Sequence, residues 1–367
     1  MGKPIKVLIS GGGTGGHIFP ALSIANALRR RDASTEIMFV GADNRMEMER
    51  VPAAGYEIVG LPIAGFDRKR LWRNFRVLWL LIKSRRIASK LIRDFKPDVA
   101  VGVGGYASGP TLMMAQKHGV PTLIQEQNSY AGMTNKHLGA KADRICVAYD
   151  GMDRFFPAAA IIKTGNPVRD VIANCKATQE EAKRELGFDP NRPLVAVVGG
   201  SLGARTINES VMASMDMITA AGADILWQTG KFYAEECLKA AEGKEHVKAM
   251  AFVDRMDLVY RAADLIVSRA GASTISELQL VGAPAILVPS PNVAEDHQRK
   301  NAEALSTRDA AVMILDADSR EQLGAQVVAL LGDKSRLDML RANVAAMGLP
   351  NSDERIVDEI YNLIGRK

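Results

Sequence analysis

The sequence predicts an α/β protein built from two Rossmann-like domains with a cleft between them. Three observations carry this prediction. Short apolar strands alternate with helical stretches along most of the chain, a strand, glycine-rich loop and helix occur near residue 10, and the same pattern restarts near residue 194. Such alternation is typical of a parallel sheet covered by helices. The chain has 367 residues, enough for two domains of this kind.

The first domain is expected over residues 1–165. Its first strand leads into the glycine loop 11–16, and a helix with apolar residues on one face follows to about residue 31. A second glycine loop, 102–110, comes after another strand of the same half. Strands are expected at 6–10, 36–40, 99–103, 122–125, 145–148 and 161–163.

The second domain is expected over residues 166–349, after the segment 164–169, in which a glycine and a proline punctuate the chain. A third glycine loop, 199–205, follows its first strand. Beyond about residue 320 only helices are expected, and the last of them, within 350–367, could complete the first domain. Strands are expected at 194–198, 224–228, 247–252, 264–268, 284–289 and 311–315.

Composition limits the class of protein. Hydrophobic residues make up 47% of the chain and charged residues 24%, as in globular proteins. The three cysteines are odd in number and widely spaced, which predicts no disulfide framework and fits a reducing cytosol. No apolar signal segment precedes the first strand. The longest apolar run, 280–289, is too short for a helix that crosses a bilayer.

Most of the excess positive charge lies in one segment. The net charge is +5, but between Asp67 and Lys96 eleven Lys or Arg residues accompany two Asp, a local charge of +9. Trp72, Phe75 and Trp79 are interleaved with these cations, which is typical of a helix lying on an anionic membrane surface. Leu71, Phe75, Leu78 and Ile82 recur at helical spacing, and core packing is the alternative for that stripe. We expect no nucleic-acid partner, because no recognition motif accompanies the helix.

The first glycine loop has the spacing of a dinucleotide fingerprint, Gly11-x-Gly13-x-x-Gly16, in which glycines let backbone amides approach a diphosphate. An NAD-dependent oxidoreductase is therefore one interpretation, with Asp43 as its ribose-binding acid. His17 favours another, because an imidazole directly after the loop is well placed for an acceptor hydroxyl. The alternative role for His17 is to cap the helix.

Two more polar segments are expected at the same edge of the first sheet. The second glycine loop and the first together suggest a ligand with an extended diphosphate, although a pair of tight turns is the alternative. Glu126, Gln127 and Asn128 follow the strand at 122–125. These side chains are expected either to contact the ligand or to form a hydrogen-bonded loop network.

The second domain carries the segment around which a nucleotide-sugar pocket is expected. A strand at 264–268 runs into a glycine turn and a helix that carries Glu277, and the next strand leads into the polar loop 295–301. Helix amino-termini suit phosphate, and a carboxylate within a helix can accept hydrogen bonds from sugar hydroxyls. Ser201, in the third glycine loop, adds a hydroxyl for a phosphate, with a plain turn as the alternative. No His and Cys spacing predicts zinc, and no cofactor is expected.

The motifs are specific in combination. They are Gly11 to His17 with Ile18-Phe-Pro20, Gly104-Gly-Tyr106, Glu126-Gln-Asn128, Gly165-Asn-Pro-Val-Arg169, Gly199-Gly-Ser-Leu-Gly-Ala-Arg205, Arg269-Ala-Gly-Ala272 to Glu277, and His297-Gln298 to Asn301. Together they resemble the MurG family of peptidoglycan glycosyltransferases, which form lipid II. The resemblance covers nearly the whole chain. It implies a GT-B fold, with the UDP-sugar donor in the carboxy-terminal half, the lipid acceptor in the other half, and a peripheral location at the cytoplasmic face of the cell membrane.

The resemblance also implies roles for single residues. Glu277 would bind the ribose hydroxyls, Ser201 the donor phosphate, and Arg169 with the backbone near Val253 the uracil side. Asn128, Ala272 and Gln298 would bind the sugar. The first two glycine loops would hold the acceptor diphosphate, and part of the first loop would also touch the donor. The acceptor diphosphate residues would be Gly13, Thr14, Gly15, Gly16, Gly104, Gly105 and Tyr106, of which Thr14, Gly15 and Gly16 are shared with the donor.

The implied reaction is an inverting transfer of N-acetylglucosamine from its UDP carrier to the C4 hydroxyl of undecaprenyl-diphosphate-linked N-acetylmuramoyl-pentapeptide. His17 is the expected general base, because an imidazole with a reference pKa of about 6.5 accepts a proton at neutral pH. Glu126 is the alternative base. Three other interpretations stay open: a related transferase acting on another lipid such as diacylglycerol, the NAD-dependent oxidoreductase, and a non-catalytic nucleotide-binding protein at an anionic membrane surface.

Overall fold

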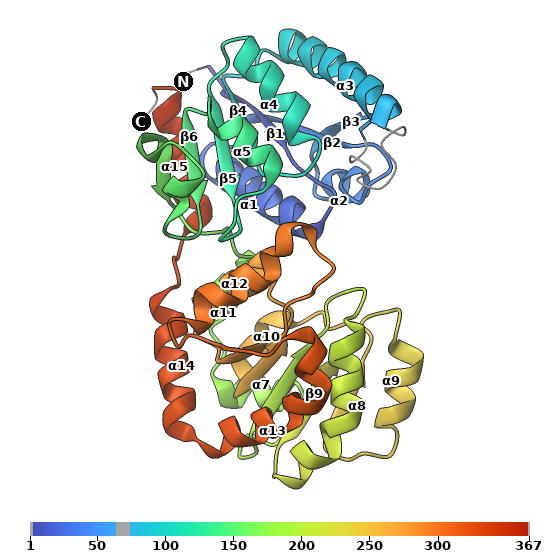
Figure 1. Ribbon diagram of the computed structural model, residues 1–367. Coiled ribbons are helices and arrows are strands. Elements are labelled where there is room, and N and C mark those ends of the chain that lie inside the picture. Colours follow the sequence, from blue (N-terminus) through green and yellow to red (C-terminus); the bar gives the residue numbers. More distant parts are fainter. Residues whose placement is uncertain (1–2, 64–73, 366–367) are drawn as a thin grey trace. The chain divides into compact units, whose positions relative to one another are not determined.

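The chain folds into two compact units (Figure 1). The computed structural model describes residues 3–63 and 74–365. Unit 1 comprises residues 1–168 and 351–367, and unit 2 comprises residues 169–350. The chain therefore passes from unit 1 to unit 2 between Val168 and Arg169, and its last helix returns to unit 1.

Unit 1 contains a seven-stranded sheet whose strands all run parallel. The strands are β1 (Lys6–Ser10), β2 (Glu36–Ala42), β3 (Glu57–Leu61), β4 (Val99–Gly102), β5 (Thr122–Glu126), β6 (Arg144–Val147) and β7 (Ile161–Lys163). Their order in the sheet is β3-β2-β1-β4-β5-β6-β7. The α-helices are α1 (Gly15–Arg31), α2 (Glu47–Ala53), α3 (Asn74–Phe95), α4 (Ser108–Lys117), α5 (Met133–Gly139) and α15 (Ser352–Leu363).

Side chains alternate between the two faces of this sheet, and helices cover both. Val7 and Ile9 of β1 pack with α1 and α15 on one face, whereas Leu8 packs with α3 and α4 on the other. The last helix, α15, adds Ile356 and Ile360 to the first of these clusters, and both are fully buried. The near-continuous apolar strands of the sequence are thus explained by burial on both faces.

Strand β3 was not predicted. This segment pairs in parallel with β2 at the edge of the sheet. Its sequence Glu-Ile-Val-Gly-Leu is only partly buried and is interrupted by Gly60, so it lacks the apolar run that marked the central strands. Two expected strands of the second half, at 284–289 and 311–315, are also shorter than predicted, because their flanking residues already belong to loops.

Unit 2 contains a six-stranded parallel sheet in the order β10-β9-β8-β11-β12-β13. Its strands are β8 (Leu194–Val198), β9 (Asp224–Gln228), β10 (Val247–Met250), β11 (Leu265–Ser268), β12 (Ala285–Leu287) and β13 (Val312–Met313). Its α-helices are α6 (Asp170–Ala173), α7 (Gln179–Glu185), α8 (Arg205–Ala220), α9 (Ala234–Ala241), α10 (Met256–Ala262), α11 (Ala272–Val281), α12 (His297–Ser306), α13 (Ser319–Gly332) and α14 (Lys334–Ala346). The prediction of two parallel-sheet α/β domains is confirmed.

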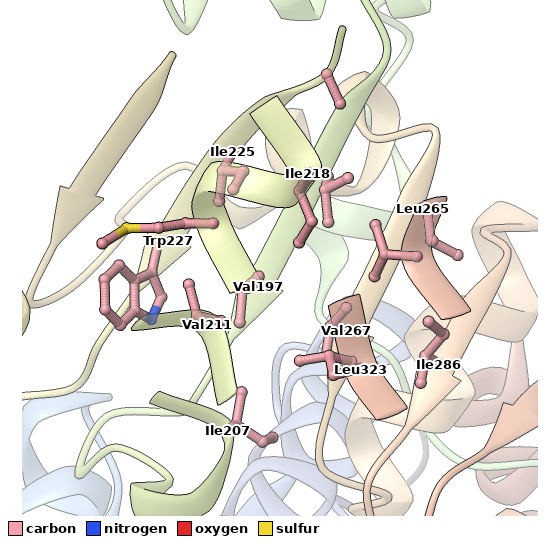
Figure 2. Close-up of a cluster of buried hydrophobic side chains, with 14 of the residues drawn as sticks. Val197, Ile207, Val211, Ile218, Ile225, Trp227, Leu265, Val267, Ile286 and Leu323 are labelled. Carbon is pink, nitrogen blue, oxygen red and sulfur yellow. The ribbon is translucent and has the colours of Figure 1, made fainter. Parts of the chain in front are cut away.

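One hydrophobic cluster of unit 2 lies between its sheet and the helices α8 and α13 (Figure 2). Trp227 of β9 is fully buried there, and its indole N–H donates to Asn208 Oδ1 of α8 over 3.0 Å. The Asn208 amide in turn donates to the Thr229 carbonyl at 2.9 Å. These bonds fix the start of α8 to the end of β9, and thereby position the glycine loop that precedes α8.

Candidate functional site

The predicted site residues of unit 1 gather at the edge of the sheet where the strands end, here called the carboxyl edge. The first glycine loop joins β1 to α1, with Thr14 at the N-cap and Gly15 as the first helical residue. The N–H groups of Gly15 and Gly16, in the first turn, have no carbonyl partner within their own helix. They are the groups that could donate to a phosphate at this helix end.

His17 lies in the first turn of α1 and bends back over the loop. Its Nδ1 is 3.1 Å from the Gly12 carbonyl oxygen and 3.3 Å from Thr14 Oγ1. A carbonyl oxygen can only accept, so the bond to Gly12 requires the proton of the neutral ring on Nδ1. That tautomer leaves the lone pair on Nε2, the nitrogen that could take a proton from a substrate.

The second glycine loop, between β4 and α4, packs directly against the first. Gly104 and Gly105 both have positive φ, 95° and 86°. A Cβ atom on Gly105 would lie 2.3 Å from the Gly12 carbonyl oxygen, and one on Gly104 would lie 2.9 Å from Nε2 of His17. Both glycines therefore leave room for the imidazole and its carbonyl partner. Tyr106 follows with an exposed side chain.

Glu126 ends β5 and is 1% exposed. Its Oε1 accepts from the N–H and the side-chain amide of Asn128, at 3.1 and 3.2 Å. Its Oε2 accepts from the Gly132 N–H at 3.1 Å and from the Asn135 amide at 2.9 Å. A carboxylate can accept about four hydrogen bonds, so these four donors use its full capacity. Glu126 thus holds the loop that presents Asn128.

In unit 2 the third glycine loop joins β8 to α8. The Gly199 N–H donates to the Gln228 carbonyl and the Gly203 N–H to that of Gly200, each over 3.1 Å. Ser201 is an exposed residue of this loop, four positions before the first residue of the sixteen-residue helix α8. A hydroxyl beside a helix amino-terminus is a suitable phosphate ligand.

Glu277, in α11, is 5% exposed and lies in a polar cluster. Arg169 donates to it through two parallel bonds, Nε to Oε1 at 2.8 Å and a terminal nitrogen to Oε2 at 3.1 Å. The Tyr260 hydroxyl donates to Oε2 over 2.8 Å. Burial, and next the charge of Glu277, hold the pKa of Tyr260 well above its usual value, so the phenol keeps its proton and remains a donor.

The other predicted donor residues of unit 2 also follow strand ends. Val253 comes after β10 and is buried, and Ala272 is the first residue of α11, after β11. Gln298 is in the first turn of α12, and its Oε1 accepts from the Ser290 N–H at 2.9 Å, just beyond β12. The donor residues predicted in unit 1, Thr14 to Gly16 and Asn128, lie at the carboxyl edge of the other sheet.

Two residues of these clusters, Tyr260 and Glu47, were not among the predicted site residues. Both are buried, and each bonds to a predicted site segment. For Glu47 a signal existed, because it closely follows β2 and so had to lie at the carboxyl edge.

Of the predicted membrane residues, Trp79 is described fully and is 60% exposed on α3. Phe75 belongs to the first turn of α3, but its side chain lies outside the described residues, as does the whole of Trp72. Leu78 and Ile82, for which core packing was the alternative, are exposed at 51% and 43%. Among the described residues, no helix is both long and apolar enough to cross a bilayer.

Two family models match the chain, one in each half. The model described as "Glycosyltransferase family 28 N-terminal domain" matches residues 7–147, and "Glycosyltransferase family 28 C-terminal domain" matches residues 194–356. Each match begins close to the first strand of its sheet and extends through the glycine loops described above.

A protein of Parabacteroides distasonis, named UDP-N-acetylglucosamine--N-acetylmuramyl-(pentapeptide) pyrophosphoryl-undecaprenol N-acetylglucosamine transferase, is 56% identical over 368 residues, 100% of both chains. The chain belongs to the MurG family. A protein of the same name from Phocaeicola vulgatus is 54% identical, over 99% of this chain and 97% of its own. MurG of Acinetobacter baumannii, a solved structure, has a TM-score of 0.81 at 26% identity, over 98% of this chain and 100% of that one. These matches confirm the predicted resemblance to the MurG family and the predicted GT-B fold.

Proposed function

We propose that this protein is an inverting glycosyltransferase that moves N-acetylglucosamine from UDP-N-acetylglucosamine to the C4 hydroxyl of undecaprenyl-diphosphate-linked N-acetylmuramoyl-pentapeptide. One observation carries the proposal: relatives named for this transfer are 54–56% identical over essentially the full chain. The fold alone would not carry it, because one fold hosts many activities.

The direct test is turnover of UDP-N-acetylglucosamine with a lipid-linked muramoyl-pentapeptide acceptor, followed by UDP release and by the mass of the product. Calorimetry against UDP-N-acetylglucosamine, UDP-glucose and NADH separates the other interpretations. Tight NADH binding without UDP binding would contradict the proposal, and so would turnover with diacylglycerol but not with the muramoyl acceptor.

Unit 2 is proposed to bind the donor. Ser201 and the amino-terminus of α8 would hold the diphosphate, Glu277 the ribose, Arg169 and the segment at Val253 the uracil side, and Ala272 with Gln298 the sugar. Negative charge develops on the diphosphate as the bond to the anomeric carbon breaks. Fixed helix dipoles and loop amides aimed at that charge stabilise it without having to reorganise.

Unit 1 is proposed to bind the lipid acceptor through its two glycine loops, with His17 as the base. The acceptor oxygen forms its bond to the anomeric carbon, the bond from that carbon to the UDP oxygen breaks, and the hydroxyl proton passes to Nε2 of His17. The bond from Nδ1 to the Gly12 carbonyl supports this assignment, because it leaves the lone pair on Nε2. The alternative base, Glu126, already accepts four bonds from its own loop.

Helix α3 is proposed to hold the protein at the cytoplasmic face of an anionic membrane. Leu78, Trp79 and Ile82 are exposed, and Lys83 Nζ lies 5.5 Å from the centre of the Trp79 ring. Apolar and aromatic side chains next to cations are the composition of an interfacial helix. Another part of α3 is anchored in unit 1, where Ala88 and Ile92 are buried among other core residues.

The triple variant Leu78→Ser, Trp79→Ser, Ile82→Ser is expected to bind anionic vesicles at least about tenfold more weakly, because each large apolar side chain contributes about 1.5 kcal/mol or more when it leaves water. Vesicle sedimentation measures this, and UDP affinity should not change. The pair Met217→Ser, Leu238→Ser removes exposed apolar side chains from unit 2 and is the control. Vesicle binding that survives the triple change would exclude α3 as the contact.

Gly105→Ala is expected to lower kcat by about 10²-fold, since a misplacement of reacting groups by about 1 Å costs this much. The added methyl group would push against the Gly12 carbonyl, and so against the partner of His17. Gly119→Ala is the matched control, because Gly119 also has positive φ, 71°, but its Cβ would meet nothing within 4 Å. Equal activity of the two variants would show that contact between the loops is unimportant.

A further inference from the structure

Glu47 is a buried carboxylate that the proposed mechanism does not use. It is the first residue of α2 and is 0% exposed. The Ala42 N–H donates to its Oε1 at 3.0 Å, and the Gly13 N–H lies 3.1 Å from Oε1 and 3.0 Å from Oε2. Among the residues that the structure describes, no cation pairs with it. A buried carboxylate must have hydrogen-bond donors, and here these are the N–H groups of Ala42 and Gly13.

The Gly12–Gly13 peptide connects Glu47 to His17. Its N–H, on Gly13, donates to the Glu47 carboxylate, and its carbonyl, on Gly12, accepts from Nδ1 of His17 at 3.1 Å. Hydrogen bonds in such a chain polarise one another, so a negative charge at the N–H end makes the carbonyl oxygen a stronger acceptor. Glu47 and His17 therefore interact through one peptide group without touching.

The space around this peptide is too small for a side chain on either Gly12 or Gly105. A Cβ on Gly12 would lie 2.1 Å from Glu47 Oε1, and a Cβ on Gly105 would lie 2.3 Å from the Gly12 carbonyl oxygen. Glycines on both sides thus allow the carboxylate and the second loop to hold the peptide in one orientation. That orientation is the one in which its carbonyl points to the imidazole.

We infer that Glu47 is a positioning residue for His17, which it orients and polarises through the Gly12–Gly13 peptide. Its carboxylate fixes the peptide, the carbonyl holds the proton on Nδ1, and the lone pair stays on Nε2. In serine proteases a carboxylate fixes the tautomer of the catalytic imidazole by direct contact with it. The inference rests on the proposed role of His17 as the base, and it adds the group that sets the tautomer of that base.

The test is Glu47→Gln, which keeps the size of the side chain but removes its charge. The kcat should fall by about 10- to 100-fold, the range found when a metal-binding imidazole loses the partner that orients it, while UDP affinity stays unchanged. The ¹⁵N NMR signals of the His17 ring, assigned by their absence in His17→Ala, should report the Nδ1–H tautomer in the natural protein. In Glu47→Gln they should move toward the Nε2–H form.

Asp98→Asn is the matched control, since Asp98 accepts a backbone N–H, that of Lys6, at 2.8 Å at the opposite edge of the same sheet. It should change neither kcat nor the ring signals. A folded Glu47→Gln protein with the natural kcat would overturn the inference, and so would a lower kcat with an unchanged tautomer. Normal turnover in His17→Ala would instead overturn the proposed base.

Discussion

His17→Ala is expected to lower kcat by about 10² to 10⁴-fold, the usual contribution of a general base, and to leave UDP affinity nearly unchanged. The acceptor hydroxyl must lose its proton as the new bond forms, and without the imidazole only water or a poorly placed group could take it. Steady-state kinetics with both substrates, together with calorimetry against UDP, measures the two quantities separately.

His118→Ala is the control for this experiment. His118 belongs to the same unit but follows the last residue of α4, away from the glycine loop that precedes this helix. Its Nε2 is 2.7 Å from Oγ of Ser89 in α3. Removing it should not change kcat. Near-normal turnover in His17→Ala would pass the role to Glu126 or to water, and a large loss of UDP affinity would mean that the first glycine loop contacts the donor more than the acceptor.

Much of the fold could be predicted because both sheets are parallel and buried on both faces. Central strands such as β1 and β8 therefore appear as uninterrupted apolar runs, each followed directly by a glycine loop. The edge strand β3 has one poorly covered side and includes a glycine, so neither composition nor alternation marked it. Local signals weaken where burial weakens, and this is why the error occurred at an edge.

The sequence could predict which residues of the candidate site follow the ends of strands, because the topology of a parallel sheet determines this. Segments that follow the strands of one parallel sheet meet at one edge of that sheet, so Glu126 in unit 1 and Ser201 and Glu277 in unit 2 could be named from their positions. Their bonding partners could not. Glu47 lies 34 residues from Gly13, and Arg169 lies 108 residues from Glu277, and only the folded chain brings these groups within hydrogen-bonding distance.

Glu277→Gln is expected to weaken UDP binding by about 1.5 to 3 kcal/mol, the range for hydrogen bonds to a charged group. The amide would keep one acceptor oxygen but would turn an NH₂ group toward the guanidinium of Arg169 or the hydroxyl of Tyr260, both of which are donors. Ribose would then lose a charged acceptor and the fixed arrangement around it. Calorimetry against UDP measures the change.

Glu185→Gln is the control for this variant, because Glu185 pairs with Arg255 over 2.7 Å in the same unit, where both side chains are exposed. Such a pair is worth little, and its loss should not alter UDP affinity. Unchanged affinity in a folded Glu277→Gln protein would remove Glu277 from the donor site.

The bonds to Glu277 make this prediction sharper. The carboxylate of Glu277 can accept about four hydrogen bonds. Arg169 and Tyr260 together donate three, two to Oε2 and one to Oε1. While Arg169 stays in place, only Oε1 can accept one more bond, so Glu277 should bind a single ribose hydroxyl. One of the two nucleotides 2′-deoxy-UDP and 3′-deoxy-UDP should then show most of the loss seen in Glu277→Gln, and the other little. Equal, large losses for both would mean that Arg169 leaves the carboxylate when the donor binds.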